Sequence, residues 1–220
     1  QKHHGLNQRF VNRSAMKLAN IDAVLNLSLA ATVAGDGDEG FIFVDLCGSP
    51  GGFSEYIQYR YTYIQRQQQE HSCSHPNQNL HHSTASSSSS TSACRGYGMS
   101  LRGANEHGQG LSWKIRQHQQ YTICRGADGT GDIYQWQNVE NLRQQILLHH
   151  GSDMNGAHLV VADGGFDAQR DHPDQEAIAE KLVVCDAAAA LACLRPHGIF
   201  VLKMFGCRTA AMRYLVTDLA

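Results

Sequence analysis

Charged side chains recur where apolar runs of the sequence end, and their types could activate a hydroxyl group. Asp45, Asp132, Asp163 and Lys203 each lie at or just after an expected strand, and Lys17 lies in a basic helical pattern nearer the amino terminus. The carboxyl ends of parallel strands meet at one edge of a doubly wound sheet, where ligands bind. A structural ion pair between Asp163 and Lys203 is the alternative interpretation.

An α/β fold would bring these residues together. Phe41 to Val44 is a short β-rich apolar run that suits a strand buried on both faces. Further strands are expected within 95–103, 121–150, 158–167 and 199–205, and helices within 1–34, 53–60, 121–150, 174–194 and 208–220. We therefore predict one α/β domain over residues 1–220, with a Rossmann-like, mostly parallel sheet and helices on both faces.

The turn after Val44 has the composition of a ligand-binding loop. Gly48, Gly51 and Gly52 let the backbone turn tightly and approach a ligand, and Pro50 fixes one φ angle. The spacing is neither GxGxxG nor GxxxxGK[ST], so a nucleoside triphosphate is not expected here. Its position favours a cofactor loop, although a plain strand-to-helix turn that required glycines would look the same.

Composition narrows the classes of protein. A chain of 220 residues with 42% hydrophobic content can form one domain with a real core. A net charge of −2 gives no overall basic footprint, so any RNA contact would use a local patch. Seven cysteines without a CxxC pair favour a reducing compartment. No apolar run is long enough for a membrane span, and we expect no membrane partner.

Residues 65–93 form a tract rich in Gln, His and Ser with almost no apolar content. Such a tract cannot bury enough surface to order itself, so we predict a disordered insertion between the first helix of the sheet and its second strand. Several potential metal ligands lie in or near it: His71, Cys73, His75, His81 and His82. Their spacing fits no zinc module, and no metal site is expected.

Three segments carry a family resemblance. DLCGSPGGFSEYI, residues 45–57, resembles the D-x-C-x-G/A-P-G-G-F-S-E-Y loop of S-adenosylmethionine-dependent messenger RNA cap 2′-O-methyltransferases. NRSAMKLANID, residues 12–22, resembles the segment before the first strand of that family, and GYGMSLRG, residues 96–103, resembles its G-[FY]-G-M-[TS]-L-[KR]-G segment. The chain is thus similar to the FtsJ-like cap enzymes, the type that acts on the first nucleotide most of all.

The resemblance implies a catalytic set of Lys17, Asp163 and Lys203, in the order of a Lys-Asp-Lys-Glu tetrad. Lys203 would take the proton of a ribose 2′-hydroxyl, Lys17 would orient that hydroxyl, and Asp163 would hold Lys203. A lysine can act as a base only if its pKa falls, and a neighbouring cation together with partial burial has that effect.

The same resemblance assigns the binding residues. Those expected to hold S-adenosylmethionine are Asp45, Cys47, Gly48, Ser49, Pro50, Gly51, Gly52, Phe53, Asp132 and Ile133. Taken alone, Asp132 would be better interpreted as a helix N-cap. The residues expected to meet the transcript are Asn12, Arg13, Pro173, Asp174 and Gln175. Phosphate contacts are expected from Arg9, Arg13, Arg208 and Arg213.

The resemblance implies methyl transfer to the first transcribed nucleotide of 5′-capped mRNA, in the nucleus, with the transcription or capping machinery as candidate partners. Alternatives are action on the second nucleotide, a ribosomal-RNA enzyme, which ADGGF at 162–166 disfavours, and an inactive RNA-binding or scaffold module of the same fold. The tetrad glutamate and the last two strands of the usual sheet would follow Ala220. We therefore expect a carboxyl-terminally truncated domain with weak cofactor binding and slow turnover.

Overall fold

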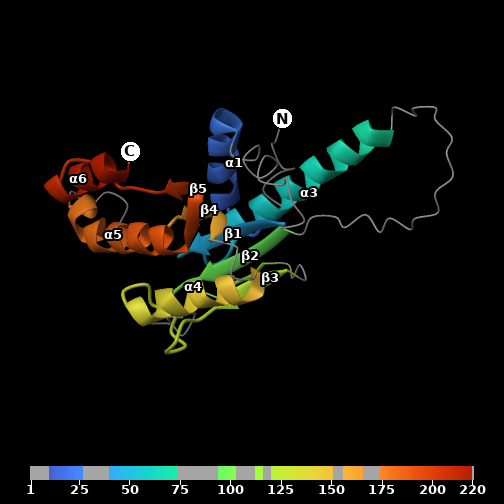
Figure 1. The fold of residues 1–220 in the computed structure, drawn as a ribbon. Coiled ribbons are helices and arrows are strands. Elements are labelled where there is room, and N and C mark those ends of the chain that lie inside the picture. Colours follow the sequence, from blue (N-terminus) through green and yellow to red (C-terminus); the bar gives the residue numbers. More distant parts are fainter. Residues whose placement is uncertain are drawn as a thin grey trace.

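The structure is a computed structural model that describes residues 10–26, 40–73, 94–102, 112–115, 120–150, 156–165 and 174–219. Within them a five-stranded sheet runs in the order β3-β2-β1-β4-β5, and every pair of neighbours is parallel (Figure 1). The strands are β1 Phe41–Leu46, β2 Cys94–Met99, β3 Tyr121–Cys124, β4 Ala157–Ala162 and β5 Leu194–Leu202. The helices are α1 Ser14–Leu25, α3 Gly52–Cys73, α4 Trp136–His150, α5 Gln175–Cys193 and α6 Ala210–Leu219. This confirms the predicted fold class.

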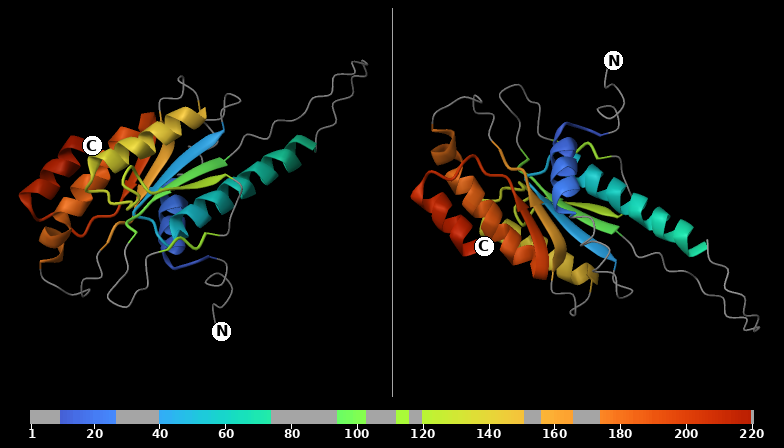
Figure 2. Two further views of the ribbon diagram at one scale, coloured as in Figure 1. Left: turned by 90° about the horizontal axis from the view of Figure 1, so that it is seen from below. Right: turned by 90° about the horizontal axis from the view of Figure 1, so that it is seen from above.

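Helices cover both faces of the sheet (Figure 2). On one face α1 and α3 pack over Phe41 and Phe43 of β1 and Leu159 and Val161 of β4. On the other, α4 and α5 pack over the alternate positions of the same strands. Because side chains alternate along a strand, β1 and β4 are apolar on both faces, as a central parallel strand requires.

The same alternation places the charged strand-end residues. Asp45 follows Phe41 and Phe43 by the two-residue period, and Asp163 follows Leu159 and Val161 in the same way. Ile199 and Val201 of β5 also pack toward α1 and α3, and Lys203 is next in that series. The face covered by α1 therefore receives all three charged side chains.

Some predicted boundaries were wrong. The last strand was expected to start at Ile199, but β5 starts at Leu194 and includes Pro196. Proline is tolerated there because β5 is an edge strand and its pairing with β4 is irregular between Ala157 and Leu159. Of the helix expected over 1–34, the described residues form α1 between Ser14 and Leu25, and residues 1–9 and 27–34 lie outside the described part of the chain.

Helix α3 continues to Cys73, past the point at residue 65 where the insertion was expected to begin. Early in this helix, large side chains such as Tyr56, Ile57 and Tyr61 pack on the sheet, and the helix then extends beyond it (Figure 1). Residues 74–93 lie outside the described part of the chain, so the rest of the predicted insertion stays a prediction. No helix among the described residues has the length and apolarity needed to cross a membrane.

Candidate functional site

The beginning of α1 is fixed beside the glycine-rich turn. Gly52 has no side chain, and a Cβ at its position would collide with the Asn12 side chain. Glu55 Oε2 accepts a hydrogen bond from the Val11 N–H at 2.6 Å, which ties the approach to α1 to the first turn of α3. Asn12 Oδ1 accepts the Ser14 N–H at 3.1 Å. The segment that carries Lys17 is thus held against the turn that follows β1.

A second contact holds α1 further along. The Asp22 carboxylate, 4% exposed, accepts hydrogen bonds from Tyr56 Oη at 2.6 Å and Arg60 Nε at 3.1 Å, both on α3. The pKa of the Tyr56 phenol is raised mainly by burial and secondly by its hydrogen bond to Asp22. Since this contact is buried and charged, it sets how α1 lies on α3.

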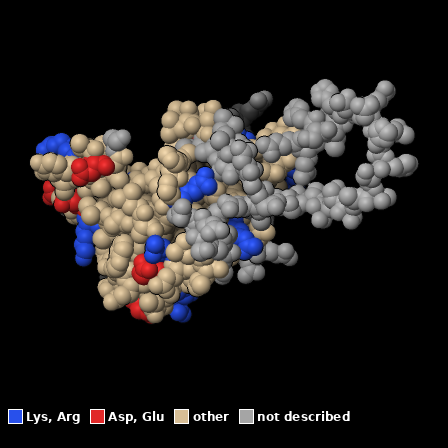
Figure 3. Space-filling view, in the orientation of Figure 1, with Lys and Arg blue, Asp and Glu red and all other residues tan. Residues whose placement is uncertain are grey.

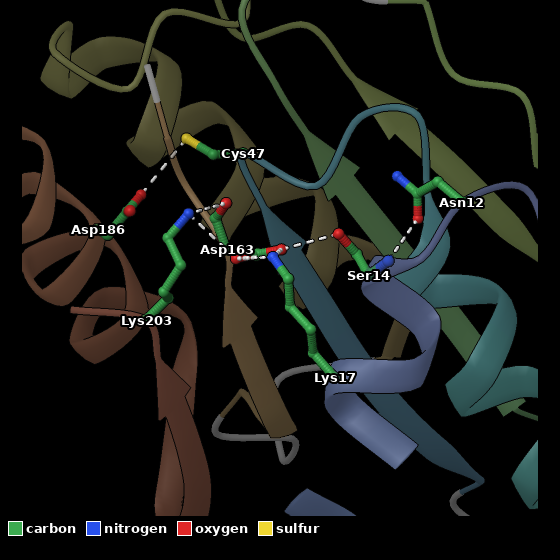
Figure 4. A network of polar contacts seen from close by, with 7 residues as sticks. All are labelled: Asn12, Ser14, Lys17, Cys47, Asp163, Asp186 and Lys203. Carbon is green, nitrogen blue, oxygen red and sulfur yellow. Dashed lines mark hydrogen bonds and ion pairs between the residues drawn. The ribbon is translucent and has the colours of Figure 1, made fainter. Parts of the chain in front are cut away.

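Lys17, Asp163 and Lys203 meet in one cluster (Figure 4). Lys17 Nζ lies 2.9 Å from Asp163 Oδ2, and Lys203 Nζ lies 3.1 Å from Asp163 Oδ1. Lys203 Nζ also donates to the main-chain oxygen of Asp163 at 3.1 Å. The sequence predicted that these residues would come together from distant parts of the chain, and the geometry agrees.

Asp163 also receives a contact that the sequence analysis missed. Ser14 Oγ donates to Asp163 Oδ2 at 3.0 Å, so the hydroxyl shares that oxygen with Lys17. Ser14 lies inside the segment that carries the family resemblance, three residues before Lys17. This position is the feature of the sequence that could have identified it. Residues three apart on a helix share a face, so Ser14 and Lys17 can reach one acceptor.

The cluster is open enough to receive a substrate. The Lys17 side chain is 55% exposed, that of Lys203 29%, and that of Asp163 10%. The carboxylate is therefore the inner, oriented member, and the two ammonium groups line the accessible side. Such an arrangement can bind a hydroxyl between two nitrogens and move a proton to or from it.

The turn after β1 rests on a buried polar chain. Asp45 lies inside β1, not beyond it, and is 0% exposed. Its Oδ2 accepts the Ser54 N–H at 3.1 Å and Ser54 Oγ at 2.6 Å, and Ser54 Oγ is 2.8 Å from Tyr121 Oη. Burial raises the pKa of Asp45 to about 7. This carboxylate supports the turn from within, so the predicted direct contact with a cofactor is not what its placement favours.

The residues above Asp45 form a tight, side-chain-poor loop. Cys47 has φ 55° and Gly51 has φ 111°, both in the left-handed region. Gly48 packs directly over the Asp45 carboxyl group, where a Cβ has no room. Ser49, Pro50 and Gly52 complete the loop, and Phe53 is buried at the start of α3. The predicted cofactor loop is thus a compact turn that leads directly into a helix.

Residues 112–115 brace this loop from the side. Lys114 donates its N–H to the Pro50 carbonyl at 2.9 Å, and the Ile115 side chain occupies the place that a Cβ of Gly51 would need. Trp113 packs against Tyr121 with ring centroids 5.7 Å apart. Trp113 therefore anchors residues 112–115 to β3.

Asp132 belongs to the segment between β3 and α4. Its Oδ1 accepts the Tyr134 N–H at 2.9 Å, and α4 starts only at Trp136, so Asp132 is not the helix N-cap of the alternative interpretation. Ile133 is buried in the core with α4. The charge of Asp132 is among the causes that raise the pKa of the Cys47 thiol, after burial and Asp186. Asp132 therefore lies at the same edge of the sheet as the turn, close enough for its charge to affect Cys47.

A further carboxylate, Asp186 of α5, was not foreseen. It is 1% exposed, and Cys47 Sγ lies 3.4 Å from its Oδ1 (Figure 4). Burial raises the pKa of Asp186 to about 7. In the sequence it stands in an alanine-rich helical run, where one acid looks like a solvent-facing residue. Only the packing of α5 on the sheet shows that it points inward.

The predicted RNA-contacting residues are placed only in part. Arg13 is exposed beside α1, whereas the Asn12 oxygen is used inside the α1 approach. Asp174 and Gln175 lie at the start of α5, and Pro173 and Arg9 lie outside the described residues. On the face shown in Figure 3 the visible Lys and Arg side chains lie at separate places.

The loop that follows Lys203 is anchored by a buried acid. Glu176, 3% exposed, accepts the N–H groups of Arg208 and Thr209, each at 2.6 Å. Arg208 Nε lies 3.3 Å from Glu176 Oε2, and Arg213 donates to the Arg208 carbonyl at 2.6 Å. Arg208 and Arg213 thus lie next to each other on the segment that leaves the lysine cluster.

The donor set of this edge suits a cationic cofactor. Its carboxylates are those of Asp45, Asp132, Asp163 and Asp186. Both lysines of the cluster are bonded to Asp163, and among the described residues no ion pair joins Asp45, Asp132 or Asp186 to a Lys or Arg. Such surroundings disfavour a polyphosphate and fit S-adenosylmethionine, whose sulfonium and amine are both positive. The residues available to hold it are the turn from Cys47 to Phe53 and Asp132.

A parallel α/β sheet with a glycine turn after its first strand and a Lys-Asp-Lys cluster at its carboxyl edge defines a methyltransferase-like protein. The model of the FtsJ-like methyltransferase family matches residues 10–218, and the chain belongs to that family.

Its relatives include three proteins named cap-specific mRNA (nucleoside-2′-O-)-methyltransferase 1. The chain is 30% identical to the one from Drosophila melanogaster over 207 residues. It is also 30% identical to those from Mus musculus and Homo sapiens, over 206 residues each. Each match covers 89% of this chain and 21% of the relative, so the chain spans about a fifth of the length of these proteins.

Proposed function

We propose that this chain transfers a methyl group from S-adenosylmethionine to the ribose 2′-hydroxyl of the first transcribed nucleotide of 5′-capped mRNA. The observation that carries the proposal is the joining of Lys17 and Lys203 through Asp163 beside the glycine turn. The family membership and the names of the relatives support the same reaction. A nuclear location and contact with the transcription or capping machinery follow as part of this proposal.

In the proposed reaction, S-adenosylmethionine supplies an electrophilic methyl group from its sulfonium. A ribose hydroxyl is a weak nucleophile, so the protein must align it and remove its proton. Lys203, whose Nζ is held by both the side chain and the main chain of Asp163, would take that proton as a neutral amine and become an ammonium group. As the oxygen–carbon bond forms, the carbon–sulfur bond breaks and its electron pair stays on sulfur.

Lys17 and Asp163 orient the participants. Lys17 reaches the cluster from α1, so its ammonium group lies across Asp163 from Lys203 and can hold the 2′-oxygen from the other side. Cys47 is not a nucleophile in this scheme, because burial and the nearby Asp186 raise the pKa of its thiol and keep it neutral. The rate enhancement comes from alignment and from charge, without covalent catalysis.

Single-turnover transfer of a tritiated methyl group to capped RNA tests the proposal, with the protein in excess so that slow transfer is still detected. Lys203→Ala should lower the rate by about 100-fold or more while leaving the S-adenosylmethionine Kd unchanged. Arg143→Ala is the matched control, because it removes a positive charge from the α4 surface, where Arg143 pairs with Glu140 at 3.3 Å. Equal rates for wild type and Lys203→Ala would refute the assignment and favour an inactive RNA-binding module.

Premethylated RNAs determine the nucleotide. A capped RNA that already carries a 2′-O-methyl group on its first nucleotide should accept no label, and one methylated on its second nucleotide should still accept it. The reverse pattern would assign the chain to the second nucleotide. Labelling of uncapped ribosomal RNA fragments at the same rate would contradict a cap-specific substrate.

A further inference from the structure

Asp186 is a buried acid that the proposed mechanism does not use. It projects from α5 to the place where the loops after β1 and β4 meet, with Cys47 Sγ 3.4 Å from its Oδ1 (Figure 4). Gly164, directly after Asp163, packs over its other oxygen so closely that a Cβ there would collide with Oδ2. The Asp186 carboxyl group therefore lies between the cofactor turn, which it contacts at Cys47, and the catalytic cluster, which it contacts at Gly164 beside Asp163.

Its charge is not balanced by a bonded cation. Among the described residues no Lys or Arg lies within ion-pair distance of Asp186. The positive charge of Lys203 acts on Asp186, but Lys203 is itself bonded to Asp163. A thiol is a weak donor, so the bond from Cys47 stabilises the charged form only slightly. A carboxylate buried in this way is stabilised when a cation binds in front of it.

The turn in front of Asp186 is where the proposed function places a cationic molecule. We propose that Asp186 is a specificity-determining residue that favours the positively charged sulfonium of S-adenosylmethionine over the neutral sulfur of the product S-adenosylhomocysteine. This inference rests on the proposed function. Cys47 and Gly164 both contact the Asp186 carboxyl group, which is 1% exposed, so its attraction for a cation in the turn is screened little by water. Loss of the methyl group removes the charge, so the product loses this attraction.

The preference should depend on pH. Burial raises the pKa of Asp186 to about 7, so the carboxyl group is mostly neutral below that value and charged above it. Charged or titratable groups face it from several elements. They are Cys47 after β1, Asp163 and Lys203 beyond β4 and β5, Tyr134 before α4, and Cys185 on α5. Around them, Asp45 and Asp132 act on Cys47, and Lys181 acts on Cys185. Of these, Asp45 has its pKa raised to about 7 as well, so a variant must separate the two acids.

Isothermal titration calorimetry with three ligands tests the inference. S-adenosylmethionine and sinefungin are positive at the position of the transferred group, and S-adenosylhomocysteine is neutral there. Asp186→Asn should weaken the two cationic ligands by about tenfold at about pH 8 and change the neutral one by less than about twofold, the effect of one partly screened charge. Asp186→Glu, which keeps the charge, should retain most of the preference.

One part of the test uses wild-type protein alone. The affinity ratio of S-adenosylmethionine to S-adenosylhomocysteine should rise several-fold between about pH 6 and about pH 8, and Asp186→Asn should flatten that rise. A flat wild-type ratio, a rise that persists in Asp186→Asn, or equal weakening of all three ligands would overturn the inference. If wild-type protein bound none of the three ligands, the proposed function would fail along with it. Binding with no charge preference would overturn the role of Asp186 alone.

Discussion

Asp163 is the residue on which the site converges. Its carboxylate receives Ser14 and Lys17 from α1 and Lys203 from beyond β5, so one side chain relates three segments. Oδ2 is shared by the Ser14 hydroxyl at 3.0 Å and the Lys17 ammonium at 2.9 Å. The serine therefore limits how the carboxylate can rotate and where Lys17 lies.

Ser14→Ala should slow methyl transfer without changing cofactor affinity. The lost hydrogen bond contributes about 1 kcal/mol, which corresponds to a rate about fivefold lower. Single-turnover kinetics together with S-adenosylmethionine titration would measure both quantities. Ser14→Thr keeps the hydroxyl and should transfer at nearly the wild-type rate. An alanine variant as fast as wild type would show that Ser14 has no positioning role.

At the scale of elements, the site depends on how α1 lies on α3. Asp22 makes the buried contact between the two helices, and Ser14 and Lys17 lie on the same α1. A shift of α1 would therefore move Lys17 away from Asp163. Stability and activity are coupled at this contact.

Asp22→Ala should destabilise the protein by about 2–3 kcal/mol, because it leaves the buried Tyr56 hydroxyl and the Arg60 guanidinium without this acceptor. Chemical denaturation measures the loss. Glu140→Ala is the control, since it breaks an exposed pair with Arg143 and should cost no more than about 0.5 kcal/mol. Similar losses for both variants would mean that the contact does not hold α1.

The strands and the charged residues at their ends were predictable, because an apolar run followed by an acid or a lysine is a local sequence pattern. Asp163 and Lys203 were singled out in this way, whereas Lys17 was singled out by the family resemblance. Ser14, Asp186 and Glu176 were not, because their partners lie far away in the sequence and their roles arise from packing. Asp45 was placed at a strand end by its position, and only the sheet shows that it is fully buried.

At the scale of the whole molecule, two buried acids link folding to pH. Burial raises the pKa of Asp45 and of Asp186 from 3.8 to about 7. A raised pKa in the folded state contributes stability that is fully present below the unfolded value and is lost as the pH rises through the folded value. Oδ1 of Asp45 has no hydrogen-bond partner among the described residues, which fits a group that tends to stay protonated.

The melting temperature should therefore fall between about pH 4 and about pH 7 and change less above that range, and Asp45→Asn should reduce the fall. Asp186 contributes to the part of the fall that remains in the variant. Differential scanning calorimetry across this range provides the comparison. A melting temperature that rises over the range, or an equal fall in the variant, would contradict the assignment of these pKa shifts.

The most direct test of the central claim is to locate the transferred methyl group. Capped RNA is incubated with excess protein and S-adenosylmethionine carrying a deuterated methyl group, digested to nucleosides, and analysed by mass spectrometry. The account predicts the deuterated methyl on the 2′-oxygen of the first transcribed nucleotide with wild-type protein, and none with Lys203→Ala. A methyl group on a base or on the cap guanine, or an unchanged yield with Lys203→Ala, would contradict it.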